Sequence, residues 1–251
     1  MAEQLEGKVA LVTAAGAGIG QATAWFLARR GAHVMAADID ANGLEETLAN
    51  APTPARIQTV VSDATTMEGA DAAVGAAVRA FGNLHILANV VGGSKPGKTV
   101  VDMPLDEWDY WVKVNLTSAY LMCKAAIPAM AKSGGGSIVN ISSGAGVRGM
   151  TKNPAYVAAK GGVVALTKAL ALDHAAEGIR ANCVAPGAIL TPLMQRNRGQ
   201  DVIDYLSKAN LVGRIGVPND IAAAVAFLSS GDGSFINGQL FDIDGGQKPI
   251  L

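Results

Sequence analysis

A serine, a tyrosine and a lysine near the middle of the chain have the types and the spacing for proton transfer at an alcohol oxygen. Ser143 lies thirteen residues before Tyr156, and Lys160 follows Tyr156 by four residues. Residues four apart on a helix share one face, so a helix here sets the ammonium group one turn from the phenol. A phenol has a pKa of about 10, and a nearby positive charge favours its ionised form. We therefore predict that Lys160 lowers the pKa of Tyr156, an acid/base residue, while the Ser143 hydroxyl holds a substrate oxygen.

Short apolar runs alternate with helical patterns along the chain and must position these residues. The apolar runs cover 8–13, 32–38, 56–63, 84–90, 136–142, 179–186 and 238–245. The helical patterns cover about 18–30, 41–50, 66–81, 106–132, 155–177 and 218–229. Near-continuous apolar runs indicate strands that are buried on both faces and therefore parallel. The alternation predicts an α/β fold of the doubly wound Rossmann type, a seven-stranded parallel sheet with helices on both faces.

No repeat or break in composition divides the 251 residues, so one domain over 1–251 is predicted. The stretch 187–217 has no strand character and carries several glycines and a proline around a helical-looking DVIDYLSKA. A segment of this length in a compact domain is more often a functional lid than an idle loop. We therefore expect a substrate lid at about 187–217.

The composition argues against several classes of protein. The net charge is −1 with no basic excess, so nucleic acid is not an expected partner. No run of eighteen apolar residues marks a membrane span, and MAEQLEGK shows no signal-peptide pattern. Cys123 and Cys183 lie far apart in apolar surroundings, which fits two reduced core thiols in the cytoplasm. The three histidines have no paired ligand spacing, so no metal site is expected.

The first expected strand ends in a glycine-rich turn suited to a dinucleotide. Gly16, Gly18 and Gly20 open the next helix, where unpaired N–H groups and the helix dipole favour a pyrophosphate. Asp38 ends the second expected strand, and its carboxylate suits the hydroxyls of an adenosine ribose. The same carboxylate would repel a 2′-phosphate, so NAD is expected rather than NADP. Asp40 fits the other role of an acid at this place, the N-cap of the following helix.

These motifs, in this order, resemble the short-chain dehydrogenase/reductase family in its single-domain form of about 250 residues. The resemblance covers nearly the whole chain. Its landmarks are TAAGAGIG, Asp63 after the third strand, NVVGG at 89–93, Asn115 in VNLTSAY, the Ser143, Tyr156 and Lys160 set, PGAILT at 186–191 and DGG at 244–246.

The resemblance implies a bound nicotinamide dinucleotide. It implies that Asp63 contacts the adenine amino group, that the backbone near Asn89 and Gly92 lines the adenosine ribose, and that Val184 and Ile189 bracket the nicotinamide. The expected cofactor residues are Gly16, Gly18, Ile19, Gly20, Asp38, Asp63, Ala64, Asn89, Gly92, Tyr156, Lys160, Pro186, Gly187, Ile189 and Thr191.

The same resemblance implies a catalytic set of Asn115, Ser143, Tyr156 and Lys160. Asn115 would position a water that relays protons between Lys160 and solvent. Its other reading is a polar residue that kinks a helix and is satisfied by backbone groups, and the two roles are compatible.

Two positions depart from the family pattern. The family usually has glycine directly after the threonine of the cofactor turn, where this chain has Ala14. Alanine fits there without strain if its φ is negative. The family's second asparagine after the fourth strand is here Val90, which removes one polar side chain.

The residues expected to face the substrate are mostly small or apolar, which suits an uncharged secondary alcohol or ketone. They are Ser143, Tyr156, Gly93, Ser94, Met150, Asn153 and Leu193. Four cations nearby could bind a carboxylate or a phosphopantetheine carrier, although a solvated loop cation is the more common role of each: Lys95, Arg148, Arg196 and Arg198. An acyl-thioester ketone, a sugar or polyol and a small alicyclic alcohol all remain open.

We therefore expect an NAD(H)-dependent oxidoreductase that interconverts a secondary alcohol and its ketone, with Tyr156 as general acid/base. The alternative within enzymes is an NADPH-dependent 3-oxoacyl-thioester reductase. A non-catalytic dinucleotide-binding redox sensor is disfavoured, because an idle fold does not need all four catalytic residues. The helices at 106–132 and 155–177 are apolar on more than one face, which indicates a homo-oligomer. The family resemblance favours a homotetramer over a dimer.

Overall fold

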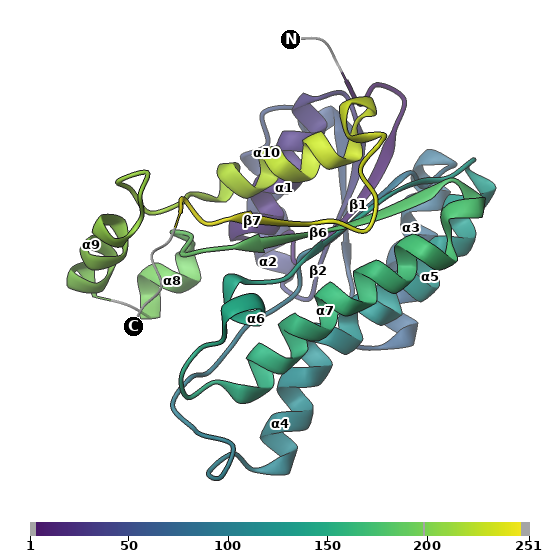
Figure 1. The fold of residues 1–251 in the computed structure, drawn as a ribbon. Helices are drawn as coiled ribbons and strands as arrows, with labels where there is room; N and C mark the ends of the chain where they lie inside the picture. Colours follow the sequence, from purple (N-terminus) through teal and green to yellow (C-terminus); the bar gives the residue numbers. More distant parts are fainter. Residues whose placement is uncertain (1–3, 198, 247–251) are drawn as a thin grey trace.

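Seven parallel strands form one central sheet in the order β3-β2-β1-β4-β5-β6-β7. The computed structural model describes residues 4–197 and 199–246 (Figure 1). The strands are β1 Val9–Thr13, β2 His33–Asp38, β3 Ile57–Val61, β4 Ile86–Asn89, β5 Gly136–Ile141, β6 Ile179–Pro186 and β7 Leu240–Ile243. Every predicted strand is present, and the predicted doubly wound parallel architecture is confirmed.

The central strands are buried on both faces, as their apolar runs predict. All five residues of β1 are buried, and so are all four of β4. The edge strand β3 differs, because only Ile57 of its five residues is buried. An edge strand pairs on one side only, so its position in the sheet explains this exposure better than its sequence does.

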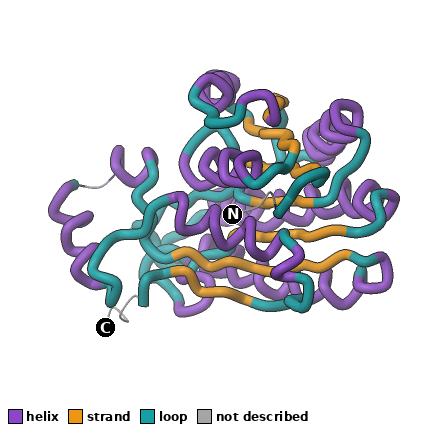
Figure 2. The backbone as a smooth tube through the Cα atoms, turned by 90° about the horizontal axis from the view of Figure 1, so that it is seen from above, coloured by secondary structure: helices purple, strands orange, loops and turns teal. Residues whose placement is uncertain are grey.

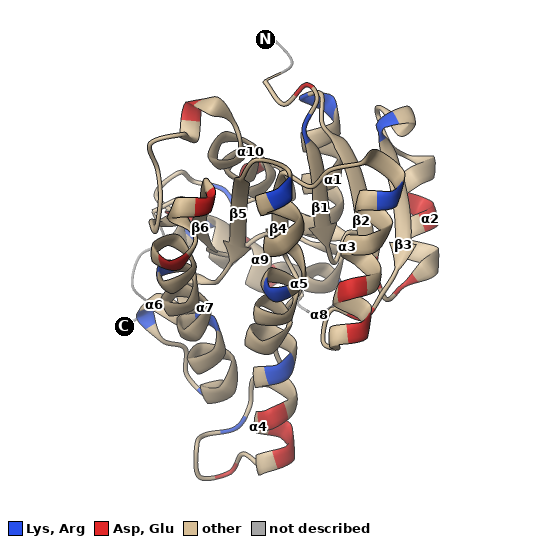
Figure 3. Cartoon of the chain, turned by 90° about the vertical axis from the view of Figure 1, so that its right-hand side faces the viewer, with Lys and Arg blue, Asp and Glu red and all other residues tan. Residues whose placement is uncertain are grey.

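Two layers of helices cover the sheet (Figures 1 and 2). One layer holds α1 Gly18–Arg29, α2 Ala41–Ala49 and α10 Pro218–Ser229. Its apolar core joins Val12 of the sheet to Leu27 and Val225 of the helices. The other layer holds α3 Met67–Phe81, α5 Ser118–Lys132 and α7 Pro154–Asp173. Figure 3 shows charged residues mainly on the helices and loops around the sheet, and the core clusters between the layers are apolar.

The helix expected over 106–132 is interrupted. It divides into α4 Leu105–Val112, a π-helical turn at Lys113–Thr117 and α5. Asn115 lies in this turn and its amide donates to the Trp111 carbonyl at 2.9 Å and to the Gly93 carbonyl at 2.8 Å. The π-helical turn widens the helix at Asn115, whose amide also bonds outside the helix to Gly93. Such turns are frequent at functional sites.

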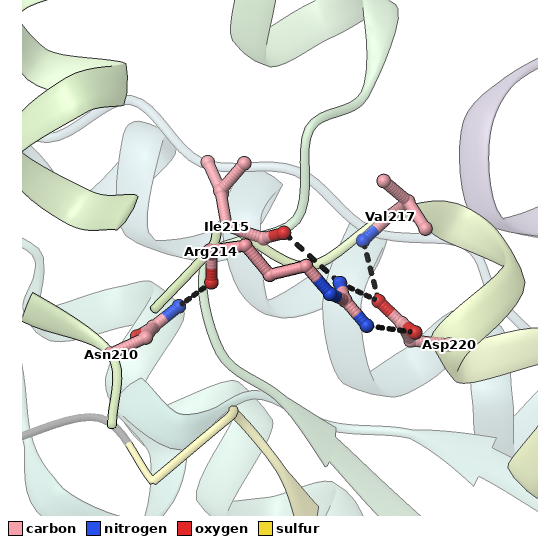
Figure 4. A network of polar contacts seen from close by, with 5 residues as sticks. All are labelled: Asn210, Arg214, Ile215, Val217 and Asp220. Carbon is pink, nitrogen blue, oxygen red and sulfur yellow. Dashed lines mark hydrogen bonds and ion pairs between the residues drawn. The ribbon is translucent and has the colours of Figure 1, made fainter. Parts of the chain in front are cut away.

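The segment expected to form a lid contains two helices, α8 Pro192–Asn197 and α9 Gln200–Ala209, which lie beyond the carboxyl end of β6 (Figure 1). A polar network fixes its return to the body of the protein (Figure 4). The Arg214 guanidinium contacts both oxygens of Asp220 at 2.7 and 2.8 Å, and Asp220 also accepts from the Val217 N–H at 2.8 Å. This guanidinium holds the pKa of the Asp220 carboxyl below its usual value.

Four short elements complete the described part of the chain: α6 Gly144–Arg148 and single turns at Pro54–Arg56, Ala175–Glu177 and Gly231–Gly233. The helix α7 is long and apolar enough to cross a membrane by length and composition alone, with a mean hydropathy of 1.3. Core helices of soluble proteins pass the same test. This one packs on β5 and β6 and carries Tyr156 and Lys160.

Candidate active site

A cleft of about 860 Å³ opens at the carboxyl ends of the strands. Its walls include the turn after β1 and the segment after β4, the two strands at which the chain order of the sheet reverses. Ligands of open α/β sheets bind at such a switch point. The expected site residues on the cleft wall are Gly18, Ile19, Gly20, Asp38, Gly92, Gly93, Ser94, Ser143, Met150, Tyr156, Lys160, Pro186, Gly187, Ile189, Thr191 and Leu193.

The glycines of the cofactor turn are required by close contacts. A Cβ placed on Gly20 would clash with the Ala14 carbonyl group, because the turn brings the backbone of α1 directly against it. Gly18 has a φ of +57°, and a Cβ there would lie 3.4 Å from the Thr191 side chain. The turn therefore leaves the N-terminus of α1 open to the cleft and close to the start of α8.

Ala14 occupies a backbone conformation that favours glycine. Its φ is +52°, in the left-handed region, and it lines the cleft. The condition for a strain-free alanine, a negative φ, is therefore not met. A non-glycine residue in this region costs on the order of 1 kcal/mol and persists where the surrounding structure fixes it. The surrounding turn therefore holds Ala14 in a backbone conformation that alanine disfavours.

Asp38 is held by backbone groups at one end of the cleft. Its carboxylate accepts from the Gly16 N–H at 2.9 Å and from the Asp40 N–H at 3.0 Å. Asp40 takes the capping role expected of it, because its side chain accepts from the Asn42 N–H at the start of α2. Asp38 therefore presents a fixed negative charge to the cleft, with no cation among its hydrogen-bond partners in the described residues.

Four expected cofactor residues lie behind or beside the described cleft wall. Gly16 is buried and serves through its N–H to Asp38. Asp63 is exposed after β3, where the Thr65 hydroxyl and N–H hold the pKa of its carboxyl below the usual value. Ala64 is 6% exposed, and Asn89 is buried with its amide donating to Asn140 at 2.8 Å.

Lys160 is buried without a carboxylate partner in the described part of the chain. It is 3% exposed, and its ammonium donates to the Ile141 carbonyl at 2.8 Å and to the Val91 carbonyl at 3.4 Å. Burial lowers the pKa of Lys160 to about 8. Two neutral carbonyls compensate an ammonium only in part, so the group is poised to lose its proton near neutrality.

Tyr156 and Ser143 face the same cleft from α7 and from the N-cap of α6. Burial raises the pKa of the Tyr156 phenol, and hydrogen bonding with the Ser143 hydroxyl opposes this rise. The expectation that Lys160 brings the phenol below its ordinary pKa is therefore wrong for these protein groups alone. Loss of water around the phenol dominates, and the Lys160 ammonium donates its hydrogen bonds to the Ile141 and Val91 carbonyls instead.

Asn115 is satisfied by backbone groups, as its structural reading predicts. Besides its two donated bonds, its carbonyl oxygen accepts from the Gly93 N–H at 3.0 Å. A Cβ placed on Gly92 would lie 2.9 Å from this oxygen and 2.7 Å from the Lys160 ammonium. A larger residue at Gly92 would displace these side chains, and Asn115 and Lys160 lie against the same point of the backbone.

The residues expected to face the substrate differ in where the structure places them. Met150 and Leu193 line it and are 51% and 53% exposed. Asn153 is instead 1% exposed, with its amide 3.5 Å from the Met150 sulfur. It is the N-cap residue of α7 and is buried, so it does not form part of the described cleft wall.

The four loop cations have different positions. Lys95 and Arg196 line the cleft. Arg148 pairs with Asp244 at 3.0 Å. Arg198 lies outside the described residues.

Sequence reasoning missed several residues of the cleft wall. They are Ala17, Val90, Pro96, Ser142, Ala188 and Pro192. Ser142 borders the cleft, and its hydroxyl donates to the Lys160 carbonyl at 2.7 Å. The other residues in this list have no reactive or charged side chain, so only the structure shows that they line the cleft.

The residues present fit a dinucleotide. The cleft brings together the open N-terminus of α1, the fixed Asp38 carboxylate and two glycines, Gly20 and Gly92. A Cβ on Gly20 would meet Ala14, and one on Gly92 would meet Lys160 and Asn115. Among the described residues, no three His, Cys, Asp or Glu side chains form a possible metal site. A doubly wound sheet with this turn, and a tyrosine and lysine in the same cleft, defines a nicotinamide-dependent oxidoreductase.

Comparison with known proteins gives the family. The family model for Enoyl-(Acyl carrier protein) reductase matches residues 13–248. The cyclohexanol dehydrogenase of Acinetobacter sp. (strain SE19) is 37% identical to this chain and covers 98% of this chain and 96% of its own. The 3-oxoacyl-(acyl-carrier-protein) reductase FabG of Thermotoga maritima is 36% identical and covers 97% of this chain and 98% of its own.

A solved structure agrees with these relatives. A Burkholderia xenovorans chain of the short-chain dehydrogenase/reductase type has a TM-score of 0.91 and 34% identity, and the match covers 97% of both chains. This protein belongs to the short-chain dehydrogenase/reductase family.

Proposed function

We propose that this protein interconverts a secondary alcohol and its ketone with NAD(H). The observation that carries the proposal is the meeting of Tyr156, Ser143 and the buried Lys160 in one cleft whose wall also includes Asp38. An alcohol bound beside Tyr156 would have its oxygen at an acid/base group and its carbon toward the dinucleotide.

Tyr156 is the proton acceptor in the oxidation direction and the donor in reduction. When bound, the oxidised nicotinamide supplies a hydride acceptor and a positive charge near the phenol. Tyr156 needs such a charge, because burial raises its pKa. Ser143 holds the substrate oxygen and stabilises the charge that develops on it.

Lys160 supports this proton transfer in two ways. Its pKa of about 8 allows it to exchange protons near neutrality, and its place in the cleft suits the ribose hydroxyls of a dinucleotide. Asn115 lies against the same point of Gly92 as the Lys160 ammonium, which supports a water relay from Lys160 to solvent.

Asp38 supports NAD over NADP. A 2′-phosphate would meet its carboxylate, and like charges at close range are unfavourable. The relationship to FabG keeps an NADPH-dependent 3-oxoacyl-thioester reductase as the second candidate, and Lys95 and Arg196 on the cleft wall favour it because they could meet an anionic carrier.

The substrate side favours an uncharged alicyclic alcohol. Met150, Leu193 and Pro96 give it an apolar surface, and the relative from Acinetobacter is named for cyclohexanol. The segment 187–217 would act as a lid over this side, since Thr191 and Leu193 already border the cleft.

We further propose a cytoplasmic homo-oligomer, a tetramer in preference to a dimer. Tyr120 of α5 and Leu172 of α7 are 46% and 81% exposed, which supports pairing of these helices between subunits. Two buried free thiols, Cys123 and Cys183, suit a reducing compartment.

A panel of secondary alcohols tests the function. Cyclohexanol, an acyclic secondary alcohol and a sugar alcohol are each supplied with NAD or NADP, and reduced nicotinamide is read by absorbance. A 3-oxoacyl thioester with NADH or NADPH tests the reverse direction. We expect turnover of an alcohol with NAD. Turnover of the thioester with NADPH alone would favour the second candidate, and no turnover on any arm would favour a non-catalytic dinucleotide-binding protein.

A further inference from the structure

Arg148 lies at the end of the helix that begins directly after Ser143. Its side chain turns back along α6 and brings the guanidinium against Gly144. A Cβ placed on Gly144 would clash with it. Arg148 is not part of the described cleft wall. The two roles expected for it, a solvated cation or a ligand for a substrate carboxylate, therefore do not describe what it contacts.

Two carboxylates from the far end of the chain hold this guanidinium. The Nη2 atom of Arg148 lies 3.0 Å from Asp244 Oδ2, and Nη1 lies 3.8 Å from Asp242 Oδ2. The side chain of Asp244 is only 11% exposed. This pair is therefore better shielded from water and salt than an ordinary surface ion pair.

Asp244 is itself fixed against the turn after β6. A Cβ placed on Gly187 would lie 2.7 Å from the Cβ of Asp244, so the two backbones are in close contact. The Gly187 N–H donates to the Ile243 carbonyl at 3.1 Å, and Asp244 Oδ1 accepts from the Gly246 N–H at 2.9 Å. The carboxylate that Arg148 meets is thus a rigid partner.

Ser143 depends on the helix that this ion pair holds. The serine is the N-cap of α6, and its hydroxyl accepts from the Ala145 N–H at 3.1 Å. A helix of five residues is too short to be stable alone, so its direction is set by tertiary contacts. Movement of α6 would carry the serine hydroxyl away from the cleft.

We propose that Arg148 is a positioning residue for Ser143, acting through its ion pair with Asp244. The pair fixes α6 against the turn that carries Gly187, and so ties the residue that holds the substrate oxygen to the wall that faces the dinucleotide. This inference rests on the proposed function, because it assigns a role in the same reaction.

The activity test uses cyclohexanol and NAD as probes. Arg148→Met lowers kcat about tenfold, since small misplacements of a reacting group are costly, while the Kd for NAD by fluorescence titration stays within about twofold. Arg148→Lys recovers part of the loss, because lysine keeps the charge without the forked geometry. Asp244→Asn has a similar effect, and Arg148→Met with Asp244→Asn is no worse than either alone.

The Ser143→Ala background separates positioning from other roles. If Arg148 acts through the serine, Arg148→Met changes kcat by less than about twofold there. A tenfold loss that persists without the serine, or an unchanged kcat in the wild-type background, overturns the proposal. An effect on KM for a carboxylated alcohol alone would make Arg148 a substrate ligand and also overturns it.

Arg56→Met is the matched control, because it breaks an arginine–glutamate pair of the same 3.0 Å length far from the cleft. It keeps the wild-type kcat. Hydrogen–deuterium exchange gives a readout that needs no turnover: peptides covering 144–149 exchange faster in Arg148→Met and not in Arg56→Met. If the wild type oxidises no alcohol, the proposed function fails, while exchange still decides whether Arg148 holds α6. Unchanged exchange over 144–149 would show that it does not.

Discussion

Asp38 ends β2 and Met150 lies beyond β5, at the two ends of the cleft on opposite sides of the switch point between β1 and β4, and the two residues are held in different ways. The Asp38 carboxylate accepts two backbone N–H groups and cannot move without breaking them. Met150 is 51% exposed, in a loop where Gly149 and Lys152 both have positive φ. The Asp38 end is fixed by backbone groups at the strand ends, and the Met150 end is formed by loops, which tolerate sequence change better. The reaction is thus specified separately from the substrate.

The same contrast holds between Lys160 and Leu193. Lys160 is buried on carbonyl groups, and a change there affects every substrate that uses the tyrosine. Leu193 is 53% exposed at the start of α8, and a change there affects only the substrates that reach it. Substitutions at the two ends should therefore differ in kind as well as in size.

Removal of the phenol hydroxyl should have the largest effect. Tyr156→Phe lowers kcat for cyclohexanol oxidation by about 10³-fold, within the range for loss of a general acid/base. The Kd for NAD, measured by fluorescence titration, stays near the wild-type value. Tyr205→Phe, in an exposed lid tyrosine, is the control and keeps kcat. Near-normal turnover in Tyr156→Phe would contradict the role of Tyr156 as the general acid/base.

Removal of the buried ammonium should stabilise the fold. The pKa of Lys160 is about 8 in the folded protein against 10.5 for the free side chain. Near pH 7 the charge is buried at full cost, so Lys160→Met raises the free energy of unfolding by roughly 2–3 kcal/mol. Between pH 8 and about 10 the folded wild type has lost a proton that its unfolded chain still holds. The wild type therefore gains stability with pH across this window and the difference shrinks.

Denaturant unfolding of both proteins across this pH range measures the difference. Lys168→Met removes an exposed lysine from the same helix and should give a curve parallel to the wild type. A Lys160→Met difference that stays constant with pH would contradict the burial of a charged lysine.

Removal of the Asp38 charge should change the cofactor rather than the substrate. Asp38→Asn keeps the shape of the side chain and removes its repulsion of a 2′-phosphate, so the ratio of kcat/KM for NADP to that for NAD rises by about 10- to 100-fold. Asp40→Asn, in the neighbouring cap of α2, is the control. An unchanged ratio would mean that Asp38 does not read the ribose.

Truncation at the open end should redistribute substrates. Leu193→Ala changes the ratio of kcat/KM between cyclohexanol and 2-propanol by about tenfold, the lower end of the range of about 1–3 kcal/mol for one apolar contact in a pocket. Leu211→Ala, in an exposed leucine outside the described cleft wall, leaves the ratio unchanged. An equal loss for both alcohols would mean that Leu193 acts on the reaction itself.

Relief of backbone strain should have the smallest effect. Ala14→Gly stabilises the protein by about 0.5 kcal/mol, because the gain from its φ of +52° exceeds the cost of a more flexible unfolded chain. It also lowers the Kd for NAD slightly, since Ala14 lines the cleft. Lys152→Gly relieves the same conformation, φ +54°, at the other end and should leave the Kd unchanged. Equal changes in the Kd for NAD in Ala14→Gly and Lys152→Gly would mean that Ala14 has no special place in cofactor binding.

The sequence predicts the dinucleotide end better than the substrate end, for a physical reason. Strands and helices have periodic sequence patterns, so the sequence alone predicts that Asp38, Gly20 and Lys160 meet at the cleft. Loop side chains have no period, and Asn153, expected to face the substrate, is buried outside the described cleft wall.

The remaining surprises depend on contacts between distant segments. Arg148 meets Asp244 across almost a hundred residues of chain, which local spacing cannot show. The φ of Ala14 follows from the turn around it, since its carbonyl group lies directly against Gly20. The pKa of Tyr156 depends on burial, which no spacing of charges reveals.

The most direct test of the central claim follows the hydrogen itself. Cyclohexanol deuterated at its carbinol carbon is oxidised with NAD, and the reduced cofactor is analysed by mass spectrometry. The account predicts that the deuterium is transferred to the cofactor without loss to water, and that Tyr156→Phe stops the transfer while still binding NAD. Deuterium released to solvent, or transfer at the wild-type rate in Tyr156→Phe, would contradict it.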